Sequence, residues 1–385
     1  MAAQRDTAKD LLARLVAFDT TSHKTNIPII EFVEAYLARH GVESTRVPTP
    51  DGQKASLFAT IGPTGVGGIA LSGHTDVVPV AGQSWDTDPF TLVERDGKLY
   101  GRGACDMKGY LACVLAAVPD LVRRKLKVPI HIAFSYDEEV GCTGVRPMIA
   151  ELGKRLTLPR YVFVGEPTDM TVVDAHKGPM RWEVELTGKA AHSSMPHLGV
   201  NAIRYAGRLL GELALIEAEL QALPPDSRFD PPYTSLQITQ IEGGTASNIV
   251  PVPCWFGWEI RRLPGFDAAP LDARFRRFAE VCAAEMQRAA PETGIKVVTT
   301  NEVPAFAADG KSGIVPLALQ LAEQNETFAV CYATEASLFQ LGGAPSVVCG
   351  PGNIAQAHTP NEFLRVEELD KCLRFLARLA DWAER

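Results

Sequence analysis

Hydrophobic and polar residues along the first 180 positions follow a pattern that predicts strands and helices in turn. Apolar runs typical of buried strands span residues 55–62, 67–74, 128–136 and 160–166. Apolar residues recur at helical spacing over 109–125 and 144–155, and an N-terminal amphipathic helix is expected to present Leu11, Leu12, Leu15 and Val16 on one face. This order predicts an α/β domain with a mostly parallel sheet and helices on both faces.

The pattern changes near residues 177–178. Alternating apolar and polar residues over 180–188, 235–244 and 252–265 predict half-exposed antiparallel strands, with helices at about 200–219 and 268–288. From about Gly294 the first pattern returns and ends in a helix over 366–384. We therefore predict a main domain of residues 1–178 and 294–385, into which a small α+β domain of residues 179–293 is inserted.

Length and charge narrow the class of protein. A chain of 385 residues usually needs more than one hydrophobic core, which agrees with two domains. The net charge of −8 gives no electrostatic basis for binding nucleic acid or an anionic membrane. The eight cysteines are scattered without a CxxC pair, and we recognise neither a signal-peptide layout nor a membrane span, so we expect a cytoplasmic protein.

Acidic residues and histidines gather where the predicted strands end. In a parallel sheet the carboxyl ends of the strands meet at one edge, so these side chains are expected to converge there. The candidates are His74, Asp76, Asp106, Glu138, Glu139, Glu166 and His358. Imidazole and carboxylate groups suit Zn²⁺ and similar ions, and a carboxylate with two oxygens can bridge two of them. Two such ions form a hydrolytic centre, in which one polarises a carbonyl and the pair lowers the pKa of a water.

The adjacent acids of "AFSYDEEVG" fit this interpretation. Neighbouring residues that leave an extended strand point to opposite sides, so one glutamate can bind metal while the other takes a proton from water. Asp137 is expected to be a solvated or turn-forming residue. Taken singly, each of these acids is more often a solvated loop residue, and it is their joint position at strand ends that favours a metal site.

The order of longer motifs along the chain resembles the M20 family of di-metal amidohydrolases. The motifs include "SGHTDVVP", "DGKLYGRGACDMKG", "DEEVG", "GEPT", "HSSMPHLGVNAI", "GGTASNIVP", "EIRRLPG", "YATEA" and "GPGNIAQAHTPNEF", and they extend over nearly the whole chain. The resemblance implies a di-metal catalytic domain, formed by the main domain, and an inserted lid and dimerisation domain. It therefore also implies a homodimer.

The resemblance also implies a role for each candidate. His74 and Glu166 match ligands of one metal, Glu139 and His358 match ligands of the other, and Asp106 matches the bridging ligand. Asp76 matches the carboxylate that orients His74, and Glu138 matches the general base. The ions are expected to be Zn²⁺, with Co²⁺ or Mn²⁺ also fitting oxygen and nitrogen ligands.

Three further residues match positions that act on the substrate in the family, and a fourth, Glu335, lies in the resembling segment "YATEA". His192 matches a histidine that stabilises the oxyanion from the partner subunit, Asn248 and Arg261 match substrate-binding positions, and Glu335 is a candidate for a substrate amino group. Arg261 suits an α-carboxylate, because a planar guanidinium grips a carboxylate through two hydrogen bonds. Each also has a structural alternative: a surface histidine for His192, a tight turn for Asn248, an ion pair with a carboxylate of the inserted domain for Arg261 and a loop carboxylate for Glu335.

The resemblance implies an N-acyl amino acid as the substrate, in particular N-acetyl-L-ornithine, whose hydrolysis belongs to arginine biosynthesis. The "YATEA" segment favours this substrate over N-succinyl-diaminopimelate, but other N-acyl amino acids stay open as alternatives. A relative that has lost activity and only binds amino acids as a dimer is the alternative of another class.

Overall fold

The computed structural model describes residues 6–385, and these form two compact units. The first unit comprises the chain up to Ala175 together with Ala307–Phe328 and Thr334–Arg385. The second unit comprises His176–Phe306 and Ala329–Ala333. Each unit is built around its own hydrophobic core.

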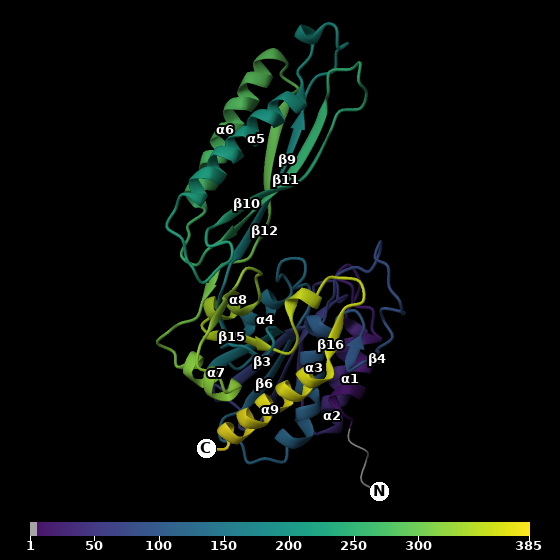
Figure 1. The fold of residues 1–385 in the computed structure, drawn as a ribbon, viewed down its shortest axis with the longest axis vertical. Helices are drawn as coiled ribbons and strands as arrows, with labels where there is room; N and C mark the ends of the chain where they lie inside the picture. The colour runs from purple at the N-terminus through teal and green to yellow at the C-terminus, as the bar shows by residue number, and fades with distance from the viewer. Residues whose placement is uncertain (1–5) are drawn as a thin grey trace. The chain divides into compact units, whose positions relative to one another are not determined.

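A nine-stranded sheet forms the centre of the first unit (Figure 1). Its order is β1-β2-β6-β3-β7-β15-β8-β13, and β14 pairs with β8. The bounds of these strands are β1 Ser44–Pro48, β2 Ala55–Ile61, β3 Ile69–His74, β6 Ile130–Ser135, β7 Tyr161–Pro167, β8 Val173–His176, β13 Phe306–Ala307, β14 Phe328–Val330 and β15 Ser346–Gly350. The central pairs β6–β3, β3–β7 and β7–β15 are parallel, whereas β1–β2 and β2–β6 are antiparallel.

The central strands β3, β6 and β7 are buried along their whole length, because helices cover the sheet. Helices α1 and α9 each pack on α3, which contacts β3 and β7, and α4 and α8 form a second contacting pair that lies against β2, β7 and β15. The helices of the unit are α1 Ala8–Val16, α2 Ile27–Arg39, α3 Gly109–Leu121, α4 Val145–Glu151, α7 Ile314–Ala322, α8 Ala336–Leu341 and α9 Val366–Ala383, with short helical turns at Ala104–Lys108 and Ile354–Gln356. The predicted α/β class with a mostly parallel sheet between helices is confirmed.

A small three-stranded sheet completes the first unit. It consists of β4 Val93–Arg95, β5 Lys98–Tyr100 and β16 Phe363–Arg365, in the order β16-β5-β4. Because β16 and β5 lie more than 250 positions apart in the chain, their pairing brings the C-terminal segment back beside the segment that precedes α3.

The second unit is a four-stranded antiparallel sheet with two long helices. The strands are β9 Gly178–Thr187, β10 Ser235–Gly243, β11 Pro253–Arg262 and β12 Gly294–Glu302, in the order β10-β11-β9-β12. The helices are α5 Ala202–Gln221 and α6 Ala269–Ala289, with a short turn at Pro196–Leu198. Side chains along β9 alternate between buried and exposed, as expected where one face packs on helices. Trp182 and Trp258 stack at the centre of this core, 3.9 Å apart.

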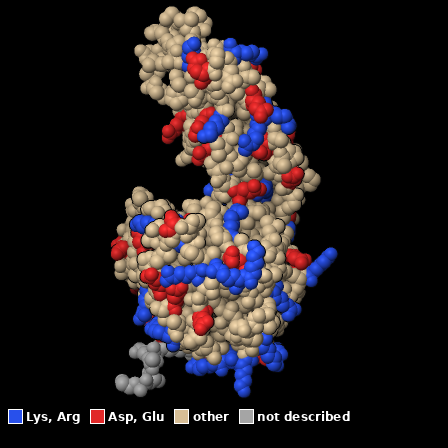
Figure 2. Space-filling view, turned by 180° about the vertical axis from the view of Figure 1, so that it is seen from behind, with Lys and Arg blue, Asp and Glu red and all other residues tan. Residues whose placement is uncertain are grey.

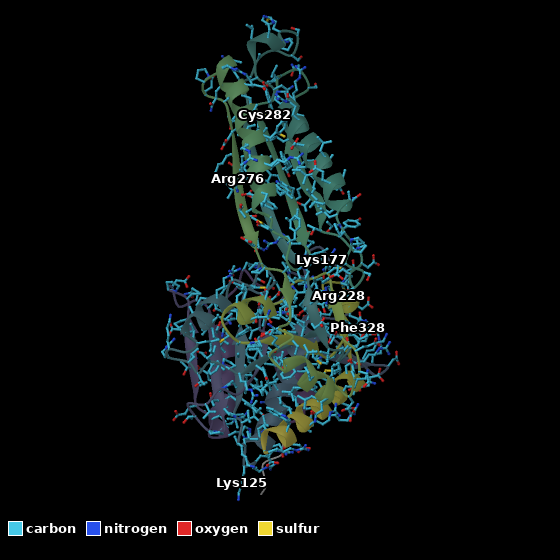
Figure 3. All side chains as sticks on the ribbon, turned by 90° about the vertical axis from the view of Figure 1, so that its left-hand side faces the viewer. Lys125, Lys177, Arg228, Arg276, Cys282 and Phe328 are labelled. Carbon is cyan, nitrogen blue, oxygen red and sulfur yellow. The ribbon has the colours of Figure 1, made fainter. Side chains whose placement is uncertain are left out.

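The second domain boundary differs from the prediction. We expected the main domain to resume at Gly294, but Gly294–Glu302 forms β12 and pairs with β9. Arg276 of α6 (labelled in Figure 3) donates hydrogen bonds to the Val297 carbonyl at 2.9 Å and to the Thr299 hydroxyl at 2.8 Å. These contacts hold β12 in the inserted unit, which therefore ends at Phe306 rather than at residue 293.

The surface gives no sign of a strongly charged binding face on the side that Figure 2 shows, where basic and acidic side chains are interspersed. Across residues 6–385, every helix is too short or too polar to cross a membrane.

Candidate metal centre

The carboxyl ends of three neighbouring parallel strands carry the candidate ligands. His74 is the last residue of β3, Glu166 is the second-last residue of β7, and Glu138 and Glu139 follow the end of β6. Because β3 pairs in parallel with both β6 and β7, these ends meet at one edge of the sheet, as the sequence predicted.

Two glycines let the segment that carries Asp106 approach this edge. A Cβ atom on Gly73 would lie 2.7 Å from side-chain atoms of Met107 and Leu111, and one on Gly165 would lie 2.1 Å from the ring of Tyr110. Glycine at these two positions, each next to a candidate ligand, therefore allows the start of α3 to pack directly on β3 and β7.

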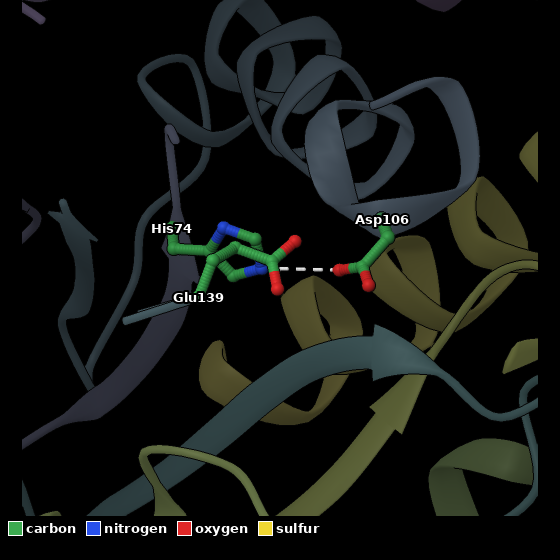
Figure 4. A group of neighbouring side chains, drawn as sticks. All are labelled: His74, Asp106 and Glu139. Atoms are coloured by element: carbon green, nitrogen blue, oxygen red, sulfur yellow. Dashed lines mark hydrogen bonds and ion pairs between the residues drawn. The ribbon is translucent and has the colours of Figure 1, made fainter. Parts of the chain in front are cut away.

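Asp106 lies between the two histidines. Its Oδ1 is 3.0 Å from Nε2 of His74, the contact drawn in Figure 4, and its Oδ2 is 3.2 Å from Nε2 of His358. One carboxylate thus presents one oxygen to each imidazole. This is the arrangement that a ligand shared by two cations needs.

The remaining carboxylates complete two groups around this centre. Oε2 of Glu139 lies 3.0 Å from Nε2 of His358, and Oε1 of Glu166 lies 3.7 Å from Nε2 of His74. Ligand atoms of His74, Asp106 and Glu139 lie within 4.8 Å of one another, and so do those of His74, Glu138 and Glu166.

Electrostatics shows that this cluster suits cations. Burial first, and then the charges of neighbouring acids, raise the pKa of Glu138 and Glu166 well above the usual range and that of Glu139 to about 7. Oε1 of Glu166 is buried without a hydrogen-bond partner among the described residues. Two divalent cations would balance the four carboxylates of Asp106, Glu138, Glu139 and Glu166, and the donor atoms are those that such ions prefer. The residues therefore fit a two-metal site.

Neighbouring carboxylates also raise the pKa of the two imidazoles, His74 and His358. Hydrogen bonds to Asp106 and Glu139 raise the pKa of His358 to about 10. Burial by itself would lower the pKa of His74, but the contacts with Asp106 and Asp76 raise it well above its usual value. Metal binding must displace these protons, because only a neutral imidazole nitrogen can be a ligand.

Asp76 contacts both His74 and the acidic loop of Glu138 and Glu139. Nδ1 of His74 lies 2.9 Å from the Asp76 carbonyl and 3.4 Å from its Oδ1, so the other ring nitrogen, Nε2, faces the cluster. The Asp76 carboxylate also accepts hydrogen bonds from the Ser22 hydroxyl and from the backbone amides of Glu138 and Glu139. Asp76 therefore fixes the position of His74 relative to the loop that carries Glu138 and Glu139.

The acidic loop differs from the prediction in its backbone. Glu138 and Glu139 do not leave an extended strand; they belong to a turn in which the Glu138 carbonyl accepts from the amides of Gly141 and Cys142. Asp137 has φ of +54° and its carboxylate pairs with Lys54, which makes it a turn residue rather than a solvated one. The two glutamates still enter different groups of the cluster, but the turn, and not strand alternation, separates them.

Glu335 lies in the first unit and is buried, with an exposed fraction of 1%. Its carboxylate accepts hydrogen bonds from the hydroxyls of Ser135 at 2.5 Å and Ser72 at 3.3 Å, and burial raises its pKa to about 7. A substrate amino group would have to replace these hydroxyls in order to bind Glu335.

The other candidate substrate residues belong to the second unit. His192 and Asn248 are exposed, and the loops that carry them come together where Ser193 donates its amide to the Asn248 carbonyl at 3.0 Å. Nδ1 of His192 lies 2.7 Å from the Ser194 hydroxyl. Arg261, on β11, donates from Nε to Glu259 at 2.8 Å.

Sequence reasoning missed the residues that support the ligands from outside. Ser22 holds Asp76, and a buried ion pair between Arg102 and Glu362 lies beneath the loop of Asp106. Arg102 and Glu362 both belong to motifs that were recognised, "GRG" and "PNEF". The signal was therefore present, but only the fold shows that these two motifs meet.

The chain belongs to the peptidase family M20/M25/M40, whose model matches residues 70–382. It is therefore a hydrolase of a metallopeptidase family, and the cluster of ligands described above fits that class.

Curated relatives cover nearly the whole chain. The chain is 39% identical over 375 residues to an acetylornithine deacetylase of Myxococcus xanthus, covering 95% of each protein. It is 33% identical over 367 residues to an acetylornithine deacetylase of Proteus mirabilis, covering 95% of this chain and 92% of the relative. A solved M20 family metallo-carboxypeptidase from Sulfolobus solfataricus shares the fold, with a TM-score of 0.78 at 18% identity over 98% of this chain and 99% of that one.

Proposed function

We propose that the protein hydrolyses N-acetyl-L-ornithine to L-ornithine and acetate. The observation that carries this proposal is full-length similarity to two acetylornithine deacetylases together with a cluster that keeps every ligand type a two-metal hydrolase needs. His74 and Glu166 would hold one ion, Glu139 and His358 the other, and Asp106 would bridge them. Zn²⁺ is the ion we propose, and Co²⁺ and Mn²⁺ suit the same donors.

Glu138 is the group to which we assign proton transfer. When bound, the two ions supply a Lewis acid for the acyl carbonyl and lower the pKa of a water. Glu138 then takes a proton from the attacking water and returns it to the leaving amine. Burial raises the pKa of Glu138 above that of an exposed glutamate, which is the direction that favours return of the proton to the leaving amine.

The second unit carries the side chains that we assign to the substrate. We assign His192 to the oxyanion, across a homodimer formed through this unit, and Asn248 and Arg261 to orientation of the substrate. A planar guanidinium such as that of Arg261 can hold the α-carboxylate by two hydrogen bonds. In this proposal the inserted domain acts as a lid, and its closure would exclude water and so strengthen each of these electrostatic contacts.

The test is release of ornithine from N-acetyl-L-ornithine by metal-loaded protein, with N-succinyl-L,L-diaminopimelate as the competing substrate. We expect turnover of the acetyl substrate, and in Glu138→Ala a loss of roughly 10²–10⁴-fold while two ions still bind. Glu43→Ala, which changes an exposed acid of the same unit, is the control and should behave as wild type.

Each other outcome has a defined meaning. Preferential turnover of the succinyl substrate would replace the proposed substrate and keep the two-metal hydrolase. Binding of amino acids without turnover of either substrate would favour an inactive amino-acid-binding dimer. Full activity of Glu138→Ala would refute the assignment of the base.

A further inference from the structure

Glu362 is a buried carboxylate in which both oxygens are saturated with hydrogen-bond donors from one loop. Oε2 accepts from Nη1 of Arg102 at 2.7 Å and from the Gly103 amide at 3.0 Å. Oε1 accepts from the amides of Cys105 at 2.9 Å and Asp106 at 3.0 Å. Glu362 therefore fixes the backbone of the residue that lies between the two histidines of the metal centre.

The same network reaches His358, four residues before Glu362. Arg102 donates from Nη2 to the side-chain oxygen of Gln83, and the Gln83 amide donates to the His358 carbonyl at 2.9 Å. Trp85 lies against the Arg102 guanidinium, with its ring centroid 5.1 Å from Cζ, and also donates to Gln83 at 3.2 Å. A continuous path of contacts thus joins the backbones of Asp106 and His358.

His358 needs such support more than the other ligands do. Its φ is +62°, a left-handed conformation that is unfavourable for a non-glycine residue and persists only where the surroundings impose it. Its side chain is also 51% exposed, whereas those of His74, Asp106 and Glu166 are 1–6% exposed. The Gln83 amide is a specific contact that holds its backbone in place.

We propose that Arg102, Glu362 and Gln83 form a positioning unit that sets the affinity of the metal centre. Glu362 acts on the shared ligand Asp106 and hence on both ions, whereas Gln83 acts on His358 and hence on one ion. The inference rests on the two-metal site of the proposed function but does not depend on the substrate. Partners of metal ligands in comparable positions typically change metal affinity roughly 10–100-fold when they are removed.

The test is calorimetric titration of metal-free protein with CoCl₂, accompanied by the visible absorption of bound Co²⁺. In wild type we expect two ions per chain. In Gln83→Met we expect one binding step to weaken roughly 10–100-fold, the same step that is lost in His358→Ala, while the other step keeps its affinity. The absorption band of that ion should change as well, because a displaced imidazole alters its ligand geometry.

Gln324→Met is the matched control. Gln324 also bridges two backbone groups of the first unit, the Met170 carbonyl at 3.1 Å and the Val172 amide at 3.3 Å, and both of these residues lie outside the metal centre. This variant should bind two ions as wild type does. The melting temperatures of the two metal-free glutamine variants should be similar, which separates positioning from a general loss of stability.

Glu362→Gln extends the test, because an amide cannot accept hydrogen bonds at both of its polar atoms. It should weaken both binding steps. The proposal would be overturned if the Gln83→Met variant bound both ions with the same affinities as the Gln324→Met control. It would also be overturned if Gln83→Met weakened both binding steps equally. A wild-type protein that binds no Co²⁺ would overturn the metal site and the proposal together, whereas failure to cleave N-acetyl-L-ornithine with intact metal binding would leave the proposal standing.

Discussion

The two units hold their candidate functional side chains in opposite ways. In the first unit His74, Asp106 and Glu166 are buried at the edge of a rigid sheet and contact one another. In the second unit His192 and Asn248 are exposed, and Arg261 is half-buried on a strand. Under the proposed function this contrast corresponds to a division of labour, in which the first unit would hold the metal ions and the second unit would supply His192, Asn248 and Arg261 to the substrate. Substitutions in the two units should therefore differ in whether metal is lost along with activity.

The largest effect is expected for Asp106→Ala in the first unit. This change removes the carboxylate that lies against both imidazoles and leaves the remaining ligands without a shared partner. Activity and metal affinity should fall by more than the roughly 10–100-fold typical of residues outside the ligand shell. Metal analysis after gel filtration should show fewer than two ions per chain, whereas Asp370→Ala, on the exposed side of α9, should keep both. Full metal content in Asp106→Ala would contradict the bridging role.

A smaller effect, without loss of metal, is expected for His192→Ala in the second unit. Removal of one group that stabilises an oxyanion typically lowers kcat by roughly 10²–10³-fold. Both ions should stay bound, because His192 lies in a different unit from the proposed ligands. His197→Ala, an exposed histidine five positions along the same loop, is the matched control and should keep wild-type kcat. Equal loss in the two variants would remove His192 from the reaction.

Arg261 and Arg181 allow a still finer comparison within the second unit. Both guanidinium groups donate to Glu259 at 2.8 Å, so either substitution removes one ion pair of that carboxylate. If Arg261 also binds the substrate carboxylate, Arg261→Ala should raise KM and lower kcat/KM roughly 10–100-fold, the value of a charge-assisted hydrogen bond of about 1.5–3 kcal/mol. Arg181→Ala should leave both constants near those of wild type. Steady-state kinetics with the acetyl substrate decides between them, and a similar loss in both variants would assign Arg261 a structural role.

The sequence predicts the metal centre better than it predicts the residues around it. His74, Glu139 and Glu166 are predictable because parallel strands end at one edge, which is a general property of such sheets. Of the two alternatives predicted for Asp137, solvated or turn-forming, the structure shows the turn, and an aspartate tolerates left-handed φ better than most residues. The pair Arg102–Glu362 was missed because 260 positions separate its members and no local pattern specifies that they meet.

The predicted end of the inserted domain, at residue 293, was wrong for a different reason. The sequence of Gly294–Glu302 has the alternating pattern of a half-exposed strand, which is the pattern of the inserted unit, but it follows the helix that we took as the end of that unit. Only its pairing with β9 and the contacts of Arg276 assign it. A strand that joins the edge of a sheet after a helix can be placed from local pattern only when its partner is known.

The smallest predicted effect concerns two histidines of the same sheet that have opposite electrostatic environments. Whereas His74 faces carboxylates, His131 on β6 is fully buried against Phe58, with Nδ1 bonded to the Thr60 hydroxyl at 2.9 Å and Nε2 unpartnered among the described residues. Burial lowers the pKa of His131 to about 4. Between pH 6.5 and 4 the unfolded chain therefore binds a proton that the folded protein does not, and stability must fall as the pH falls through this window.

The variant His131→Gln isolates this contribution, because glutamine is neutral throughout and can still bond Thr60. At pH 5 the wild type should have lost about 2 kcal/mol more of its free energy of unfolding, relative to pH 7.5, than the variant has. Urea unfolding of the metal-free proteins at the two pH values measures this difference, and the titrations of the metal ligands cancel because both proteins contain them. Equal acid destabilisation of the two proteins would show that His131 becomes protonated in the folded state, so that the contrast with His74 would not hold.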